Sequence, residues 1–160
     1  MLLIFRPFKV GDAVIVAGQA GVIDGIDLFT TNLDTADNRR IVVPNGAIFG
    51  GVIENQTYHM RRVVSVTVPV SAGVNIEFSG KRLQEAVERV VVATKGALKD
   101  PAPGVVLADI FPTVTWTVSV HAETTEYLRV RQALLREIKL TLDEHTLAPL
   151  PPVQIVRQMT

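Results

Sequence analysis

The sequence of 160 residues contains no cysteine, so it forms no disulfide, thiolate zinc site or cysteine nucleophile. Basic and acidic side chains balance at 16 each, whereas nucleic-acid binding usually requires a strongly basic surface. The apolar run at the N-terminus covers only residues 1–5, and spanning a bilayer takes roughly 20 apolar residues. Because 48% of the residues are hydrophobic, the composition is that of a packed globular chain with one or two domains.

Groups that carry catalysis or bind metal are also sparse. The three histidines are scattered through the sequence with no i,i+4 pair (His59, His121 and His145). The densest acidic cluster lacks the ligand spacing of a calcium loop (Asp24, Asp27, Asp34 and Asp37). We therefore expect no enzyme activity, no cofactor and no metal site.

Aromatic residues give a second test of nucleic-acid binding. Stacking platforms for bases need exposed aromatic side chains interleaved with lysine and arginine. Here the phenylalanines of the first half lie among apolar neighbours, which favours a core or an interface (Phe5, Phe8, Phe29 and Phe49). The sequence therefore predicts no nucleic-acid partner.

Residues 6–58 are predicted to be all β. Short β-rich runs alternate with glycines and an Asp37-Asn38 turn (Ala13–Val16, Gly21–Asp27, Phe29–Thr35 and Arg39–Val43). Pro44 should end the last of these strands, since proline donates no hydrogen bond and Asn45-Gly46 can take positive φ. Residues 47–52 are apolar, but Gly50-Gly51 argues against a long helix. Strands of this size suit a small Sm-like or SH3-like barrel, with a domain boundary near residue 60.

The second half changes periodicity and predicts the order β-α-β-β-α-β. Strands are expected over residues 63–70, 105–110, 113–122 and 153–156, and amphipathic helices over 81–99 and 126–144. Ser79 is the expected N-cap of the first helix and Asp100-Pro101 its stop; Thr124 or Thr125 is the expected cap of the second. Two helices on one face of an antiparallel sheet form the ferredoxin-like arrangement.

An ordered set of motifs gives the sharpest indication of function. The set comprises Arg6-Pro7-Phe8 with Gly11-Asp12, then Leu28-Phe29 with Thr31, then Asp37 through Pro44-Asn45-Gly46. It resembles the cytoplasmic part of the small-conductance mechanosensitive channel (MscS-type) family, over nearly the whole chain. The helical half agrees in element order, and residues 151–155 are similar to the family's closing strand. The sequence departs at Gly73-Val74-Asn75, where the family more often has an acidic, polar turn.

The resemblance implies a homoheptamer whose small barrels form a ring below the bacterial inner membrane. The α/β domains would enclose a cytoplasmic vestibule with side portals, and the channel would open under membrane tension to release ions and small osmolytes on osmotic downshock. Residues 1–5 would be the stub of the pore-lining helix, with the membrane helices missing. Phe5 would then pack near Leu28, and Asn45-Gly46 would lie close to the helix end, where the family couples barrel to gate.

The sequence leaves alternatives open for the role of several residues and for the function. The resemblance favours an interface between barrels for Ile48, Phe49 and Val52, although the same residues could complete each subunit's own core. A near-neutral vestibule wall predicts weak selectivity between cations and anions, because rings of charges of one sign discriminate ions.

The alternatives to a channel are a non-conducting ring-forming scaffold and an Sm-like module that binds a small ligand or nucleic acid.

Overall fold

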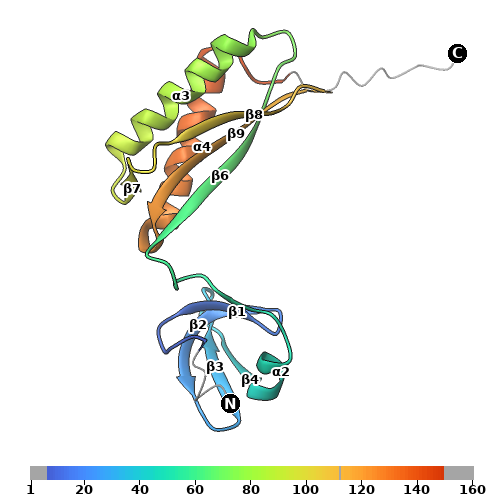
Figure 1. Ribbon diagram of the computed structural model, residues 1–160, viewed down its shortest axis with the longest axis vertical. Helices are drawn as coiled ribbons and strands as arrows, with labels where there is room; N and C mark the ends of the chain where they lie inside the picture. The colour runs from blue at the N-terminus through green and yellow to red at the C-terminus, as the bar shows by residue number, and fades with distance from the viewer. Residues whose placement is uncertain (1–6, 112, 150–160) are drawn as a thin grey trace, which may run out of the picture. The chain divides into compact units, whose positions relative to one another are not determined.

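The computed structural model describes residues 7–111 and 113–149 (Figure 1). The chain divides into two compact units, with the division between Met60 and Arg61. The first unit is all β apart from one short helix, and the second combines helices with a sheet. Sequence patterns therefore predicted the class of each unit correctly.

The first unit is a five-stranded antiparallel sheet. Its strands are β1 (Ala13–Val16), β2 (Gln19–Ile26), β3 (Thr30–Asp34), β4 (Arg40–Pro44) and β5 (Ile53–Asn55), in the spatial order β4-β3-β2-β1-β5. Apolar side chains of β1 to β4 and of the segments next to them fill its core (Phe8, Val14, Val16, Ile23, Leu33, Val43 and Ile48). The period-2 alternation thus places one face of this curved sheet inward.

Two backbone features bend and turn this sheet. The pairing of β2 with β3 shifts register between Ile23 and Gly25, which is the bend expected of a glycine inside a strand. Asn38 has φ 63° in the turn between β3 and β4. Asparagine tolerates this left-handed conformation better than most residues, so the Asp37-Asn38 turn is confirmed.

The segment after β4 differs from the expectation in two ways. The strand ends at Pro44 as expected, but the next residues form a short helix, α2 (Asn45–Phe49), rather than a turn with positive φ. Ile48 on this helix has an exposed fraction of 0% and belongs to the core, so its expected place at an interface is wrong. Phe49 and Val52 are 49% and 87% exposed and remain available for contacts.

The second unit is a sheet with two helices packed on it. Its elements are β6 (Arg61–Val70), α3 (Ile76–Ala93), β7 (Ala97–Leu98), β8 (Gly104–Asp109), β9 (Val114–Glu123), a 3-10 turn η1 (Thr124–Glu126) and α4 (Tyr127–Glu144). β9 lies at the centre, with β6 on one side and β7 and β8 on the other, all antiparallel to it. The predicted strand over 153–156 lies outside the described residues.

One continuous core joins the helices to the sheet. Leu83, Val87 and Val90 of α3 and Val130, Leu134 and Ile138 of α4 pack against β6 and β9. These are the residues of the predicted helix stripes. Burying apolar side chains contributes roughly 25 cal/mol per Å², so this core supplies most of the unit's stability.

Both helix starts differ from the sequence prediction. α3 begins five residues earlier than expected, because the Asn75 side chain accepts a hydrogen bond from the Phe78 amide at 3.0 Å and caps it. Ser79 lies inside the helix instead, where its hydroxyl accepts a buried hydrogen bond from Trp116 Nε1 at 3.2 Å. α4 begins at Tyr127, one residue after the predicted start, with Glu126 at the cap position.

The end of α3 is also earlier than predicted. The helix stops at Ala93, and Gly96 follows with φ +84°, in the left-handed region that favours glycine. Residues 97–98 then form β7 instead of a last helical turn. The expected stop at Asp100-Pro101 is therefore wrong, because the chain already reverses at Gly96.

Candidate functional site

Asn45 connects α2 to the loop between β2 and β3. Its side-chain amide donates to the carbonyl oxygens of Asp27 at 2.9 Å and Leu28 at 3.1 Å. Its side-chain oxygen accepts from the Thr31 hydroxyl at 2.7 Å, and its backbone N–H donates to the Phe29 carbonyl at 2.8 Å. One side chain thus fixes a loop that lies 14 to 18 residues away in the sequence.

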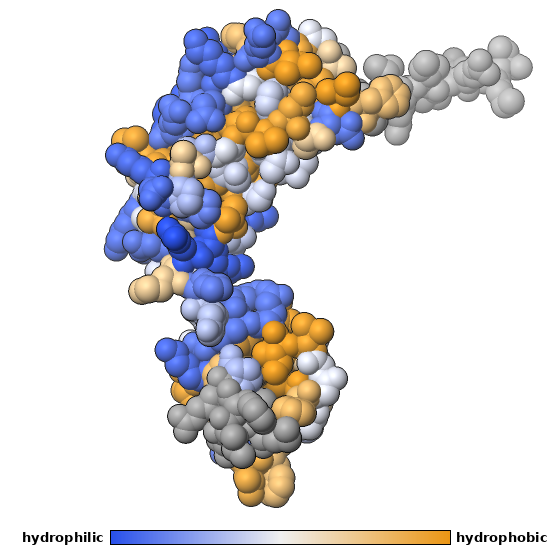
Figure 2. All heavy atoms as spheres, in the orientation of Figure 1, coloured by the Kyte–Doolittle hydropathy of each residue, from blue (hydrophilic) through white to orange (hydrophobic). Residues whose placement is uncertain are grey.

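The loop held by Asn45 presents two large apolar side chains to solvent. Leu28 is 71% exposed and Phe29 is 77% exposed. Figure 2 shows apolar side chains at the β2–β3 end of this unit. Exposed apolar groups on a rigidly held loop are typical of a contact surface rather than of a solvated turn.

A second hydrogen-bonded cluster holds the segment that leads into β1. The Asp12 carboxylate is 7% exposed and accepts from the Lys9 backbone amide at 3.0 Å and the Asn55 side chain at 2.8 Å. The Thr57 hydroxyl accepts from the Ala13 amide at 3.0 Å, and Thr57 is itself bonded to Asn55. Phe8 is buried beside this cluster. The Pro7-to-Asp12 motif is thereby fastened to β5.

Asp12 is charged over the physiological pH range. Burial by itself would raise its pKa, but the hydrogen bonds from Asn55 and the Lys9 amide, with the Lys9 charge, hold the pKa below the ordinary 3.8. A carboxylate with a lowered folded-state pKa stabilises the fold above its unfolded pKa. This stabilisation is lost as the pH falls through the folded value.

We therefore expect Asp12→Asn to lower the free energy of unfolding at pH 7 by roughly 1.5–3 kcal/mol, the usual contribution of hydrogen bonds to a charged group. Scanning calorimetry of the variant and the parent chain measures this difference, which should shrink below pH 3.8. Glu54→Gln removes an exposed carboxylate on the neighbouring β5 and serves as the control. A difference that stays constant with pH would contradict this role of the charge.

The acidic cluster of the first unit forms surface ion pairs. Arg40 binds Asp34 through two hydrogen bonds at 2.9 and 3.0 Å and also lies 2.8 Å from Asp24. Arg39 donates to Asp37 at 2.6 Å, and these contacts lower the pKa of Asp34 and Asp37. The carboxylates thus stabilise the β3–β4 hairpin, and no cluster of metal-ligand side chains occurs within residues 7–111 and 113–149.

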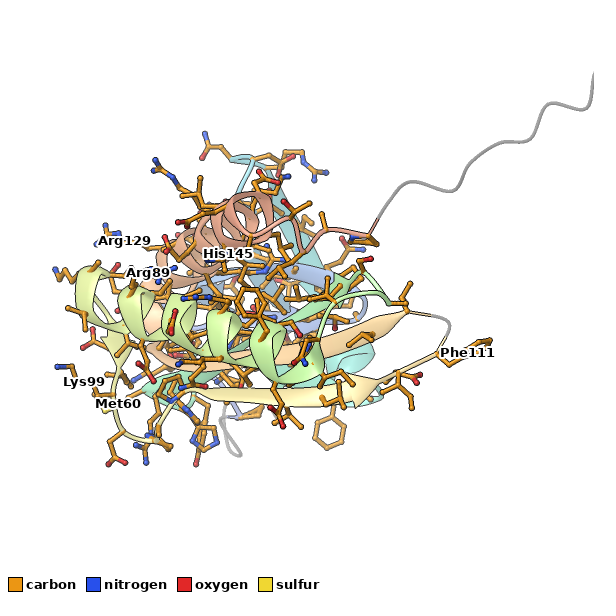
Figure 3. The ribbon with its side chains drawn as sticks, turned by 90° about the horizontal axis from the view of Figure 1, so that it is seen from above. Met60, Arg89, Lys99, Phe111, Arg129 and His145 are labelled. Atoms are coloured by element: carbon orange, nitrogen blue, oxygen red, sulfur yellow. The ribbon has the colours of Figure 1, made fainter. Side chains whose placement is uncertain are left out.

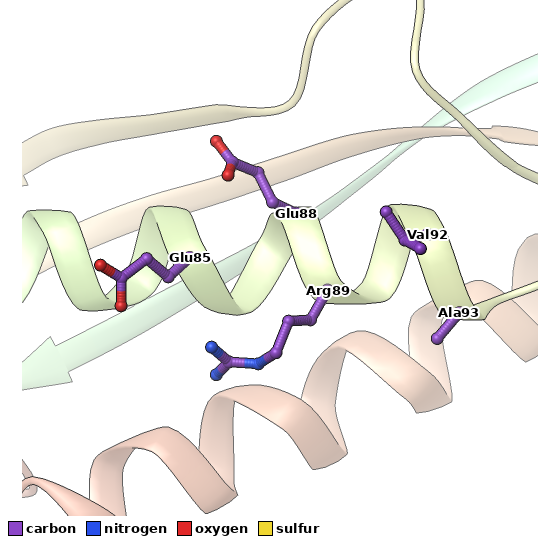
Figure 4. Close-up of a pocket in the computed structure, with 5 residues that line it drawn as sticks. All are labelled: Glu85, Glu88, Arg89, Val92 and Ala93. Atoms are coloured by element: carbon purple, nitrogen blue, oxygen red, sulfur yellow. The ribbon is translucent and has the colours of Figure 1, made fainter.

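The second unit contributes no convergent polar site in its described part. A shallow groove on α3 is lined by Glu85, Glu88, Arg89, Val92 and Ala93 (Figure 4). Arg89 reaches across to α4, where it donates to Glu137 at 2.6 Å and to Thr141 at 3.2 Å. Figure 3 shows Arg89 and His145 on the helical side and Phe111 at the β8–β9 turn. Arg89 therefore fastens two helices.

Among the comparisons with known proteins, the family model covers the first unit, whereas the relatives match across both units. A family model described as "Mechanosensitive ion channel, beta-domain" matches residues 1–58. The small-conductance mechanosensitive channel of Edwardsiella ictaluri is 29% identical over 157 residues, which cover 97% of this chain and 54% of that protein. An uncharacterized MscS family protein of Synechocystis is 27% identical over 153 residues, covering 94% and 50%. This chain is thus similar to MscS-family proteins along most of its length.

Solved structures of MscS-type channels share the fold of this chain. The closed-state crystal structure of Helicobacter pylori MscS superimposes with a TM-score of 0.82 at 24% identity, covering 99% of this chain and 62% of that one. Arabidopsis thaliana MSL1 gives a TM-score of 0.70 at 22% identity, covering 92% and 54%. The chain spans about half the length of the MscS-family relatives it matches. No helix in its described part is long and apolar enough to cross a membrane.

The structure brings together part of the set that the MscS motifs single out. Leu28 and Asn45 are joined by a hydrogen bond, and Gly46 follows in the first turn of α2. Phe5 and Arg6 lie outside the described residues, so the expected contact of Phe5 with Leu28 stays a prediction. Sequence reasoning missed Asn55, whose bond to Asp12 spans 43 residues and leaves no local signal.

Proposed function

We propose that this chain is the cytoplasmic vestibule part of a mechanosensitive channel that opens under membrane tension and releases ions and small osmolytes on osmotic downshock. The likeness to MscS proteins runs through both units and carries the proposal. In this proposal residues up to 60 belong to an Sm-like barrel domain and residues from 61 onwards to a ferredoxin-like domain. The protein sits in the bacterial inner membrane, with this portion on the cytoplasmic side.

In this proposal the Asn45 cluster couples the barrel to the pore helix. Asn45 fixes the loop that exposes Leu28 and Phe29, and α2 begins at the same residue. A loop held by several hydrogen bonds transmits a displacement instead of absorbing it. The expected contact of Phe5 with Leu28 would pass a movement of the pore helix to this loop. The Asp12 cluster fastens the connecting segment, so the helix end moves with the barrel.

The same proposal makes the chain self-assemble into a homoheptameric ring. Phe49 is the last residue of α2, and Val52 lies three residues after it. Both side chains expose apolar surface to solvent. Heterologous contacts close into a ring when the rotation between neighbours fits the subunit number. Val52 is 87% exposed in the single chain. Burying its side chain against a neighbouring subunit would contribute hydrophobic free energy to that interface.

Native mass spectrometry of the purified chain tests the assembly. We expect a closed homo-oligomer for the parent chain and a shift towards monomer for Val52→Asp. Val92→Asp is the matched control, because Val92 is 77% exposed on α3 and lies outside the proposed contact. A parent chain that remains monomeric, or an equal effect of the two substitutions, would contradict the ring.

A further inference from the structure

The sheet of the second unit has one covered face and one open face. On the covered face, Val114, Trp116, Val118 and Val120 of β9 pack into the core with α3 and α4. Because side chains alternate along a strand, the residues between them point away from the helices. Those residues form the open face, and both helices of this unit, α3 and α4, pack on the other face.

Hydroxyl groups dominate the middle of this open face. The register of β6 with β9 places Ser65 opposite Ser119 and Thr67 opposite Thr117, and Thr115 lies opposite Pro69. Ser65 and Thr67 are exposed, while Thr117 and Ser119 are half-buried. Neither strand carries Asp, Glu, Lys or Arg between positions 63 and 69 or between 115 and 121. The middle of the open face is thus uncharged and polar, while charged side chains stand only towards its ends (Arg61, Asp109 and Glu123).

The helical side has the opposite character. The exposed positions of α3 and α4 carry full charges of both signs, among them Lys81, Glu88, Arg131, Arg136 and Lys139. Charges of mixed sign on an outer surface favour solubility. Serine and threonine hydroxyls both donate and accept hydrogen bonds and carry no charge. A channel wall lined by them therefore favours neither cations nor anions.

We infer that the open face of β6 and β9 is the wall that faces the water-filled chamber, and that α3 and α4 form the outside of the ring. This inference rests on the proposed vestibule function and specifies which surface meets the permeating solutes. Its chemistry accommodates anions, cations and uncharged osmolytes alike, because Ser65, Thr67, Thr117 and Ser119 offer hydroxyls and no charge. Two exposed valines also lie on this face, Val63 opposite His121 and Val106 opposite Thr117.

Single-cysteine labelling of the whole chain tests the inference, since the sequence has no cysteine of its own. Ser65→Cys places a nearly isosteric thiol on the open face, and Gln132→Cys places one at an exposed position of α4. In the assembled oligomer, a small maleimide should modify both thiols. A large poly(ethylene glycol) maleimide should modify only the α4 thiol, because the polymer cannot enter the chamber. In urea both reagents should modify both thiols.

The other outcomes separate the inference from the function on which it rests. An intact oligomer in which the polymer modifies both thiols equally would overturn the inference and leave the vestibule proposal standing. So would an oligomer in which the Ser65→Cys thiol reacts with neither reagent, since the face would then be buried between copies. A chain that is monomeric by native mass spectrometry overturns both. Thr67→Cys repeats the test at a second exposed position, should Ser65→Cys fail to fold.

Discussion

Gly96→Ala is expected to destabilise the second unit by about 2–5 kcal/mol. Gly96 has φ +84°, which an alanine adopts only with strain. An added Cβ would also stand 2.3 Å from the Cβ and 2.6 Å from the Cγ of Glu126, well inside van der Waals contact. The first contact is with an atom fixed to the backbone of η1, so no rotation of the glutamate relieves it.

The measurement uses the single tryptophan of the chain, Trp116, which is 8% exposed in the core of this unit. Urea unfolding followed by its fluorescence gives the free energy of unfolding for the parent chain and each variant. Gly73→Ala is the control, because no atom lies within 4 Å of an added Cβ there and its φ is not positive. We expect Gly73→Ala to change the stability by at most about 1 kcal/mol. Equal midpoints for the two variants would refute the account of Gly96.

Gly96 also explains why the sequence pattern did not predict the end of α3 correctly. The apolar stripe of the helix continues in register to Leu98, so periodicity alone extends the helix past its true end. The positive φ of Gly96 reverses the chain, and the Glu123 amide donates to the Gly96 carbonyl at 2.8 Å. That partner lies in β9 and is distant in the sequence. The apolar periodicity therefore predicts the buried face of the helix, but it does not reveal the tertiary contact at which the helix ends.

Local patterns succeeded where the determining contacts are local. The strand alternation of residues 63–70 and 113–122 depends only on which side chains are apolar, and both strands form as predicted. The Asp37-Asn38 turn depends on the conformational tolerance of Asn38. Ser79 shows the opposite case. It is a good N-cap by residue type, but the ring of Trp116, 37 residues away, uses its hydroxyl as an acceptor.

The candidate site was predictable in its residues but not in its geometry. The motifs single out Leu28, Asn45 and Gly46, and the structure joins Leu28 to Asn45 through a hydrogen bond. The sequence gives no sign that Thr31 donates its buried hydroxyl to the same asparagine. Nor does it show that Asn45 begins a helix, because Pro44-Asn45-Gly46 has the composition of a turn. The packing of Ile48 into the core selects the helix.

Asn45→Ala is expected to loosen the β2–β3 loop by about 2–4 kcal/mol. The substitution removes two donors from the Asp27 and Leu28 carbonyls and leaves the Thr31 hydroxyl, on a residue 0% exposed, without its acceptor. Hydrogen exchange of the β2 and β3 amides measures the opening. Since 1.4 kcal/mol corresponds to a factor of ten, exchange should accelerate by about 30- to 700-fold.

Two further variants separate the roles of the Asn45 side chain. Asn45→Asp keeps the acceptor for Thr31 but turns a charged oxygen towards the carbonyl oxygens of Asp27 and Leu28, so it should loosen the loop at least as much as alanine. Asn32→Ala removes one exposed hydrogen bond of 3.3 Å to Asp27 and should change exchange by less than tenfold, about 1 kcal/mol. If Asn45→Asp exchanged as slowly as the parent chain, the two donor bonds would contribute nothing. The loop that exposes Leu28 and Phe29 would then be held by β2 and β3 alone, and Asn45 would lose its place as the residue that stiffens it.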